Sequence, residues 1–492
     1  MSKIPIRQQE TLSQTKRKLL EGYRRGGLAH TLIRPVKITP RLKGDTAPLS
    51  LAQEQIWCRE EMCAGRSLPH NECITLKANK CLDPAVLERS FAEIIRRHEI
   101  WRTSYGIENG QPIQVVHKAS NSFPLRIVDL RAASEAERET ELHKLYTEGT
   151  RQPFDLGRGP LLRVVLVTLT NTDQRILVFA HLSIVDGVSV YQILPAELAS
   201  LCDAFSAGKT SPLAELPIQY ADYAYWQRQW LKSPELAEQL TYWREELAGE
   251  LPVLPWPTDR PRPAVQTHRG AVRSFALRRS LRGALKRFSQ CEGVTLFTTL
   301  AASLSALLYC YTRQADIMLG TPSLGARKRS EVQALLGHFL NPVPLRINLE
   351  GDPSFHELLL RTQKAVGGAV SHDDVPLEIL AQELQLNPSP TRSPFFTIAI
   401  SLQPETPETD AGWLVTSMDA DSGGTIWDLY LAFIETKDGL IGRAQYNTDL
   451  FEGATITHTL EELQVVMESV AGDPRQRIST LPSQLPTFGA LL

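Results

Sequence analysis

The chain has 492 residues, of which 42% are hydrophobic and 22% charged, a balance typical of a globular protein with sizeable cores. Its net charge of −2 gives no indication of binding to nucleic acid or to an anionic membrane. The seven cysteines include no CxxC pair, which favours reduced thiols over a disulfide framework or a zinc site. No long apolar run and no apolar signal core occurs, so we expect a cytoplasmic protein without a membrane contact.

The first 48 residues are predicted to form a basic helix followed by a linker. Ser13 is a candidate N-cap for a helix over residues 12–25, and a Gly-Gly pair follows it. Residues 1–45 carry 11 Lys and Arg against three acidic residues, an excess of eight positive charges. Two interpretations are open, a solvated linker and a docking surface for an acidic partner.

A first lobe is predicted over residues 49–248. Its clearest early element is a helix over residues 83–99, which Asp83 can cap and in which Pro84 suits the first position. A hairpin and a second helix follow. Their predicted ranges are 161–169 and 174–180 for the strands, with a turn at 171–173, and 188–205 for the helix.

A proline-rich run over residues 249–265 cannot form a helix or a central strand, so we place the linker between two lobes there. The second lobe is predicted over residues 266–485, with a tail over residues 486–492. It mixes helices and strands as the first does, which predicts two similar α/β lobes. The predicted ranges are 294–312 for a long apolar helix and 316–322, 394–402, 426–435 and 440–447 for strands.

The segment FAHLSIVDG over residues 179–187 places His181 and Asp186 where a strand passes into a loop before a helix. Junctions of this kind present side chains into clefts. A general base with an orienting carboxylate would fit the pattern, and so would a capped turn with a satisfied buried histidine. No GxSxG, HExxH, Walker or dinucleotide motif indicates another chemistry.

Seven blocks in order resemble the motifs of nonribosomal peptide synthetase condensation domains, over about residues 48 to 480. Residues 181–187 are similar to the HHxxxDG signature of that family. The other blocks are SLAQEQIW (50–57), RHEIWRTSY (97–105), YADYAYW (220–226), LGHFLNPVPLR (336–346), SHDDVPLE (371–378) and TRSPFF (391–396).

The resemblance implies a pseudo-dimer of two chloramphenicol-acetyltransferase-like α/β lobes in a V, with a central tunnel. Donor and acceptor carrier proteins are expected to dock at its two mouths, beside neighbouring synthetase domains. Their phosphopantetheine arms bring an acyl or aminoacyl thioester to an aminoacyl amine, and an amide forms, in a nonribosomal peptide or hybrid polyketide synthetase. The chain itself is expected to bind no cofactor and no metal.

Residue by residue, His181 matches the first histidine of the signature, Asp186 its aspartate and Gly187 its glycine. Leu182 stands where the family has its catalytic histidine. Leucine can neither accept a proton nor donate a hydrogen bond, so impaired or atypical activity is expected. The resemblance also implies supporting roles for three further residues, namely Arg102 as the partner of Asp186, Ser183 and Asn341.

Three explanations of the leucine stay open. The chain is a non-catalytic module that recruits carriers or other partners, or an enzyme that turns over slowly on positioning alone, or an ordinary enzyme into which the leucine was introduced. His181 is a poor substitute because neighbouring residues of an extended segment point to opposite faces. His98 is expected to be structural, whereas His338 and His372 lie near tunnel-forming blocks or at the surface.

Epimerising and heterocyclising relatives are weaker alternatives. The first also need the missing histidine, and the second carry a DxxxxDxxS pattern that has an aspartate where this chain has His181.

Overall fold

The computed structural model divides the chain into two units, Met1–Ile38 and Thr39–Leu492, and the second is described below. The predicted helix over residues 12–25 lies outside the described residues. These are 37–41, 44–62, 70–78, 80–120, 122–386, 391–403, 413–417, 421–436 and 439–484.

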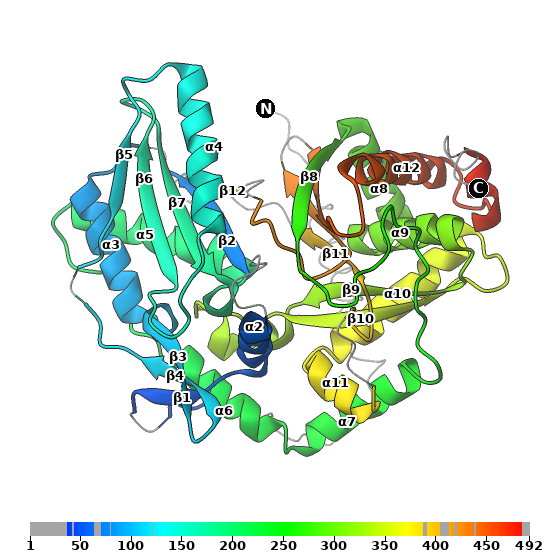
Figure 1. Ribbon diagram of the computed structural model, residues 1–492, viewed down its shortest axis with the longest axis horizontal. Helices are drawn as coiled ribbons and strands as arrows, with labels where there is room; N and C mark the ends of the chain where they lie inside the picture. The colour runs from blue at the N-terminus through cyan, green and yellow to red at the C-terminus, as the bar shows by residue number, and fades with distance from the viewer. Residues whose placement is uncertain are drawn as a thin grey trace, which may run out of the picture. The chain divides into compact units, whose positions relative to one another are not determined.

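The first lobe is built on a five-stranded sheet with the strand order β12-β2-β7-β6-β5 (Figure 1). The predicted hairpin is confirmed, because β6 and β7 pair antiparallel with Leu162 opposite Ala180. The strands are β2 (Asn71–Lys77), β5 (Arg126–Asp129), β6 (Leu162–Thr168), β7 (Gln174–His181) and β12 (Leu414–Ser417). A smaller sheet beside it has the order β1-β4-β3. Its strands are β1 (Thr46–Pro48), β3 (Thr103–Glu108) and β4 (Gln111–Val116).

Strand β12 comes from the second half of the chain, although residues 266–485 were predicted as one lobe. It pairs antiparallel with β2, with Val415 opposite Leu76. The pairing covers the edge of the first lobe's sheet, which would otherwise present unpaired backbone groups. The second lobe therefore contributes one strand to the first, and the chain does not divide cleanly between them.

The helices of the first half include the predicted α3, which is confirmed. The carboxylate of Asp83 caps it by accepting a hydrogen bond from the Ala85 backbone N–H at 2.8 Å. Within the described ranges these helices are α2 (Leu51–Met62), α3 (Pro84–Arg97), α4 (Glu135–Arg151), α5 (Leu194–Ser206), α6 (Tyr220–Trp230) and α7 (Pro234–Glu246). Residues 249–265 form neither helix nor strand, as their prolines predict.

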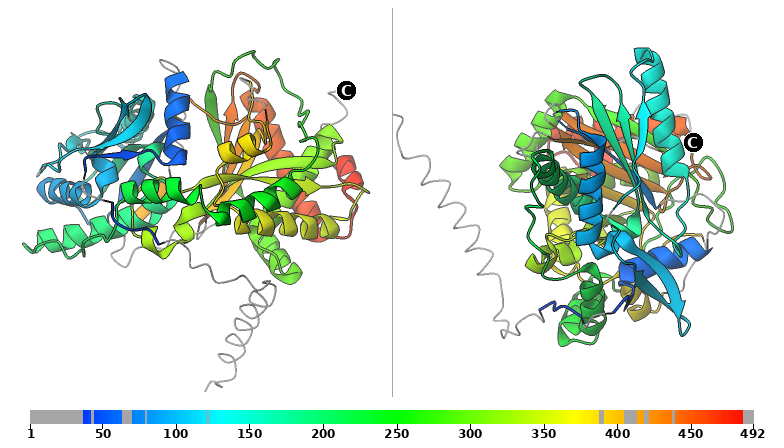
Figure 2. Two further views of the ribbon diagram at one scale, coloured as in Figure 1. Left: turned by 90° about the horizontal axis from the view of Figure 1, so that it is seen from below. Right: turned by 90° about the vertical axis from the view of Figure 1, so that its left-hand side faces the viewer.

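The second lobe holds a six-stranded sheet with the order β10-β9-β11-β13-β14-β8, and further helices accompany it (Figure 2). The strands are β8 (Gly270–Leu277), β9 (Asp316–Ser323), β10 (Asn341–Asn348), β11 (Ile398–Gln403), β13 (Leu429–Thr436) and β14 (Gly439–Asn447). The helices are α8 (Arg279–Glu292), α9 (Leu296–Thr312), α10 (Phe355–Ser371), α11 (Leu377–Glu383) and α12 (Gly453–Gly472).

Short turns complete the architecture and place several site residues. The 3-10 turns are Glu99–Arg102, Leu182–Ile184, Gly325–Lys328, Ser330–Val332 and Ile478–Gln484, and a π-helical turn covers Ser189–Ile193.

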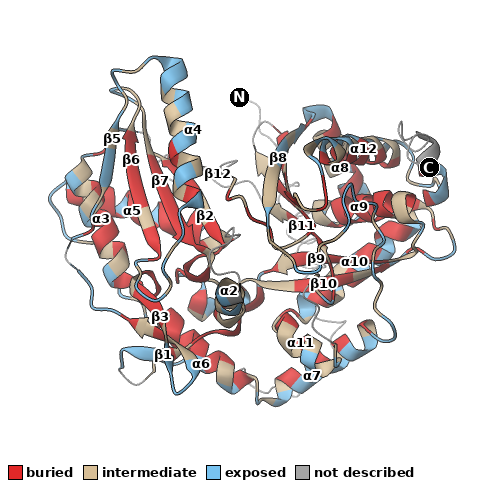
Figure 3. Ribbon diagram, viewed as in Figure 1, coloured by how far each residue is buried: buried red, intermediate tan, exposed pale blue. Residues whose placement is uncertain are grey.

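Buried residues concentrate in the two large sheets and in the helices packed on them (Figure 3). The long apolar helix α9 is buried along most of its length, as its composition predicts. Among the described residues no single helix is long and apolar enough to cross a membrane, and only the pair α8 and α9, bent by 105° at their junction, passes that test together. The six cysteines in the described part of the chain are free thiols.

Candidate active site

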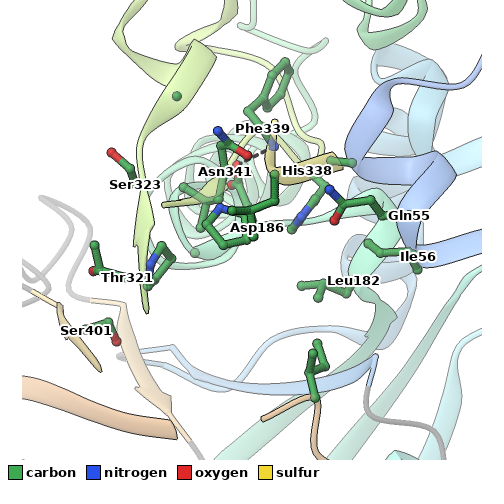
Figure 4. Close-up of a pocket in the computed structure, with 18 of the residues that line it drawn as sticks. Gln55, Ile56, Leu182, Asp186, Thr321, Ser323, His338, Phe339, Asn341 and Ser401 are labelled. Atoms are coloured by element: carbon green, nitrogen blue, oxygen red, sulfur yellow. Dashed lines mark hydrogen bonds between the residues drawn. The ribbon is translucent and has the colours of Figure 1, made fainter. Parts of the chain in front are cut away.

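A cavity of about 1470 Å³ is lined by both lobes (Figure 4). Ordinary small-molecule pockets have roughly 300–1,000 Å³, so this one has room for an extended substrate. The first lobe contributes Gln55, Ile56, Leu182, Asp186 and Gly187, and the second contributes Thr321, Ser323, His338, Asn341 and Ser401.

The signature loop borders this cavity. Strand β7 ends at His181, and the 3-10 turn that follows is fixed by a hydrogen bond from the Leu182 backbone N–H to the His70 carbonyl at 2.7 Å. The Leu182 side chain faces the open space (Figure 4). The predicted catalytic position therefore lies on the cavity wall and carries an apolar group.

The His181 ring is buried away from the cavity lining. Its Nδ1 lies 2.8 Å from the Ser183 hydroxyl, and its Nε2 lies 3.7 Å from a carboxylate oxygen of Glu60. Ser183 is buried beside it, and its carbonyl accepts a hydrogen bond from the Gln53 amide at 3.3 Å. Both residues are buried beneath the loop, and neither lines the cavity.

Glu60, His70 and His181 form the one group among the described residues whose ligand-type atoms lie close enough to hold a metal ion, within 4.8 Å of one another. Hydrogen bonds between these side chains explain why they lie so close together. Burial raises the pKa of Glu60, but bonds to His181 and His70 outweigh it and hold the pKa at about 2. Burial lowers the pKa of His70 to about 4, so a neutral imidazole meets a carboxylate.

Asp186 is buried between the lobes and meets Arg327. The guanidinium donates from Nε to one carboxylate oxygen and from Nη2 to the other, each at 2.9 Å. The Ser189 backbone N–H donates at 2.8 Å and the Phe339 N–H at 3.1 Å. The side chains of Asp186 and Arg327 are 0% and 2% exposed. Both carboxylate oxygens of Asp186 are therefore engaged, and the pairing with Arg327 links the two lobes.

The prediction that Arg102 pairs with Asp186 is wrong. Arg102 instead lies 3.6 Å from Glu99 and donates to the carbonyl of His117. It belongs to the turn after α3, on the first lobe. The arginine that reaches Asp186 comes from the other lobe, in the turn Gly325–Lys328 that directly follows β9.

Asn341 and Gly187 both line the cavity. The Asn341 amide donates to the carbonyls of Asp373 and Val375, at 2.8 and 2.7 Å, and so ties the start of β10 to the segment after α10. A Cβ added to Gly187 would lie 3.8 Å from the Tyr191 ring, an ordinary contact. Gly187 therefore leaves its backbone open to the cavity without being required by packing.

The structure separates the two histidines that the sequence left undecided. His338 lines the cavity, and its Nδ1 lies 3.1 Å from the carbonyl of Val185. His372 lies outside the lining and stacks on Tyr242 at 3.9 Å. His98, expected to be structural, is buried with its Nε2 2.9 Å from Glu197.

A carboxyl group from the second lobe completes the lining. Glu378 accepts a hydrogen bond from the Gln55 amide, which joins α11 to α2 across the cavity. Burial raises the pKa of Glu378 to about 7. Glu378 and His338 both line the cavity and are candidate proton acceptors in place of the absent histidine.

Sequence reasoning missed Arg327, Glu60 and His70. Arg327 is one of three consecutive basic residues, and nothing in the run marks which of them is buried. Glu60 and His70 are separated along the chain and belong to none of the recognised blocks. Only the fold brings them to the end of β7.

The family model for the Condensation domain matches residues 43–488. One of the linear gramicidin synthase proteins of Brevibacillus parabrevis is 42% identical over 439 residues, which cover 88% of this chain and 9% of that protein. The chain belongs to the condensation-domain family. It spans only 6% to 9% of the length of the three linear gramicidin synthase proteins that it matches.

Solved structures show the same fold. The X-domain from teicoplanin biosynthesis matches with a TM-score of 0.78 and 27% identity, over 92% of this chain and all of that one. The first condensation domain of the calcium-dependent antibiotic synthetase matches with a TM-score of 0.75 and 21% identity, over 88% and 98%. The predicted pseudo-dimer of chloramphenicol-acetyltransferase-like lobes is confirmed.

Proposed function

We propose that this condensation domain joins a carrier-bound acyl or aminoacyl thioester to the amine of a carrier-bound aminoacyl group. The observation that carries the proposal is the cavity. It is lined by both lobes, it is large enough for an extended substrate, and the signature loop borders it through Leu182, Asp186 and Gly187.

Condensation domains work with carrier proteins and neighbouring synthetase modules. Their substrates are attached to the phosphopantetheine arms of the carrier proteins. In our proposal a donor arm and an acceptor arm both enter this cavity, and the domain works in the cytoplasm within a larger synthetase. Holding both reacting groups in one space makes their reaction effectively unimolecular, which removes much of the entropic barrier.

The residues of the site divide this work. Asp186 and Arg327 hold the signature loop against the second lobe, and Asn341 holds the start of β10. Gly187 leaves room for the substrate near the loop backbone. The thioester is already an activated acyl donor, so the missing imidazole at position 182 weakens proton transfer and leaves positioning intact.

The alternative is a non-catalytic module that recruits a partner. A similar structure, the X-domain from teicoplanin biosynthesis, is known in a complex with OxyB. In this chain the open cavity and its titratable lining favour the enzyme.

The test is an amide-formation assay with loaded donor and acceptor carriers. The product is detected as an increase in the mass of the acceptor carrier. We expect the chain to transfer the acyl group faster than a no-enzyme control, and Leu182→His to be at least as fast. If neither form yields product with any carrier pair tried, the recruiting module becomes the better account.

A further inference from the structure

The cavity retains an imidazole on its second-lobe side. His338 follows the 3-10 turns after β9 and precedes β10, and it lines the same space as Leu182. In Figure 4 its side chain lies between Asp186 and Gln55, on the side of the pocket where Leu182 also lies.

One hydrogen bond fixes which nitrogen of His338 carries the proton. Its Nδ1 lies 3.1 Å from the carbonyl oxygen of Val185, which can only accept. Nδ1 is therefore the donor, and in the neutral ring Nε2 keeps its lone pair. Among the described residues Nε2 has no hydrogen-bond partner, so it is free for a substrate group.

The loop that carries His338 is held on both sides, which limits the motion of the ring. Tyr220 donates to the His338 carbonyl at 2.6 Å, and the backbone N–H of Phe339 donates to Asp186 at 3.1 Å. Gly337 has φ of +150°, and a Cβ there would lie 2.2 Å from Tyr220, so only glycine lets the loop pass so close. A base held in this way needs little reorganisation before it reacts.

The electrostatic surroundings keep this ring neutral near pH 7. Burial lowers the pKa of His338, and the positive charge of Arg327 and the ring of His181 act in the same direction. Asp186 and the Val185 carbonyl act in the opposite direction but do not reverse the shift. The charge of Asp186 is itself balanced by its bidentate pairing with Arg327.

We propose that His338 is the proton acceptor for the attacking amine, in place of the histidine absent at position 182. The proposal rests on the proposed function. The amine nitrogen attacks the thioester carbon as its proton passes to Nε2, and the C–S bond then breaks. His338 returns that proton to the leaving thiolate, so the products are an amide and a free phosphopantetheine thiol.

The test replaces His338 with asparagine. The amide nitrogen of the new side chain can still donate to Val185, as Nδ1 does, but the variant has no atom equivalent to Nε2. For His338→Asn we expect amide formation at pH 7.5 to fall by about 10²–10⁴-fold, with an unchanged melting midpoint. His372→Gln serves as the matched control, since that ring lies outside the cavity lining, and it should keep the original rate.

Two further measurements distinguish a base from a structural residue. The rate ratio between the original chain and His338→Asn should shrink as the pH falls through the pKa of His338, which burial places below the ordinary histidine value of about 6.5, because a protonated imidazole cannot accept the amine proton. Adding Leu182→His to His338→Asn should recover the lost rate.

An unchanged rate in His338→Asn, while the original chain forms amide, would overturn the role of His338 and leave the proposed function standing. If the rate of amide formation fell in Glu378→Gln but not in His338→Asn, the proton acceptor would be the Glu378 carboxyl group and not His338. If the original chain and Leu182→His both form no amide, the proposed function and this inference fall together.

Discussion

Asp186 and Arg327 form a charge pair in which both partners are almost fully buried, at 0% and 2% exposure. Removing one partner of such a pair leaves an uncompensated charge in the interior. We expect Arg327→Ala to lower the free energy of unfolding by about 3–5 kcal/mol, measured by denaturant titration. Arg102→Ala removes a partly exposed arginine with a 3.6 Å ion pair and should cost no more than about 1 kcal/mol. Equal losses in the two variants would contradict the assignment.

At this scale the sequence showed that Asp186 needs a partner but not which residue supplies it. The motif of the first lobe contains Asp186, whereas Arg327 lies 141 residues further along the chain. The resemblance to the family motifs indicated Arg102, which lies on the same lobe as Asp186. The observed pairing with Arg327 depends instead on how the two lobes pack together. The sequence likewise did not show whether His338 lies at the surface or in the cavity, because its location depends on the fold.

Among the elements, helix α10 holds two adjacent glycines with different surroundings. A Cβ at Gly368 would lie 2.3 Å from the Tyr242 hydroxyl, and nothing lies within 4 Å of one at Gly367. Tyr242 cannot move freely because its ring stacks on His372 at 3.9 Å.

Alanine should therefore have opposite effects at the two positions. Gly368→Ala should destabilise by about 1–3 kcal/mol through overpacking, whereas Gly367→Ala should stabilise by about 0.5–1 kcal/mol because alanine restricts the unfolded chain and favours helix. Melting midpoints of the two variants decide the matter. A stabilised Gly368→Ala would contradict the close approach of Tyr242 to α10.

Local chemistry made several elements predictable. Asp83 and Pro84 mark the start of α3, and the apolar composition of residues 294–312 marks α9. Strand β12 has only four residues, and its pairing with β2 is set by an edge far away in the sequence. No local pattern contains that information.

At the level of the whole molecule, the buried His98 links the two lobes and makes the stability of the folded chain sensitive to acid. The Leu336 backbone N–H donates to Nδ1 of His98 at 3.2 Å, so Nε2 carries the proton toward Glu197. Burial lowers the pKa of His98, although Glu197 opposes the shift. The unfolded chain then binds a proton below about pH 6.5 that the folded chain resists.

Stability should accordingly fall as the pH drops from about 7 toward 5, because protonation favours the unfolded chain. Thermal melting across that range measures the effect. His98→Gln should weaken the pH dependence, since glutamine does not titrate. If the slope of stability against pH were the same in the variant, His98 would not be a source of the acid sensitivity.

Amide formation is proposed to take place in the cavity that both lobes line, and a cavity-filling variant can test this. Gly187 lines the cavity, and a Cβ there would make only ordinary contacts, so we expect Gly187→Trp to fold and to place an indole in the cavity that Leu182 also lines. Gly472→Trp, at a position with open space around it, is the matched control. In a single-turnover assay with loaded carriers, we expect Gly187→Trp to lose amide product at least about tenfold and the control to keep it. Equal product from a folded Gly187→Trp and its control would contradict the claim.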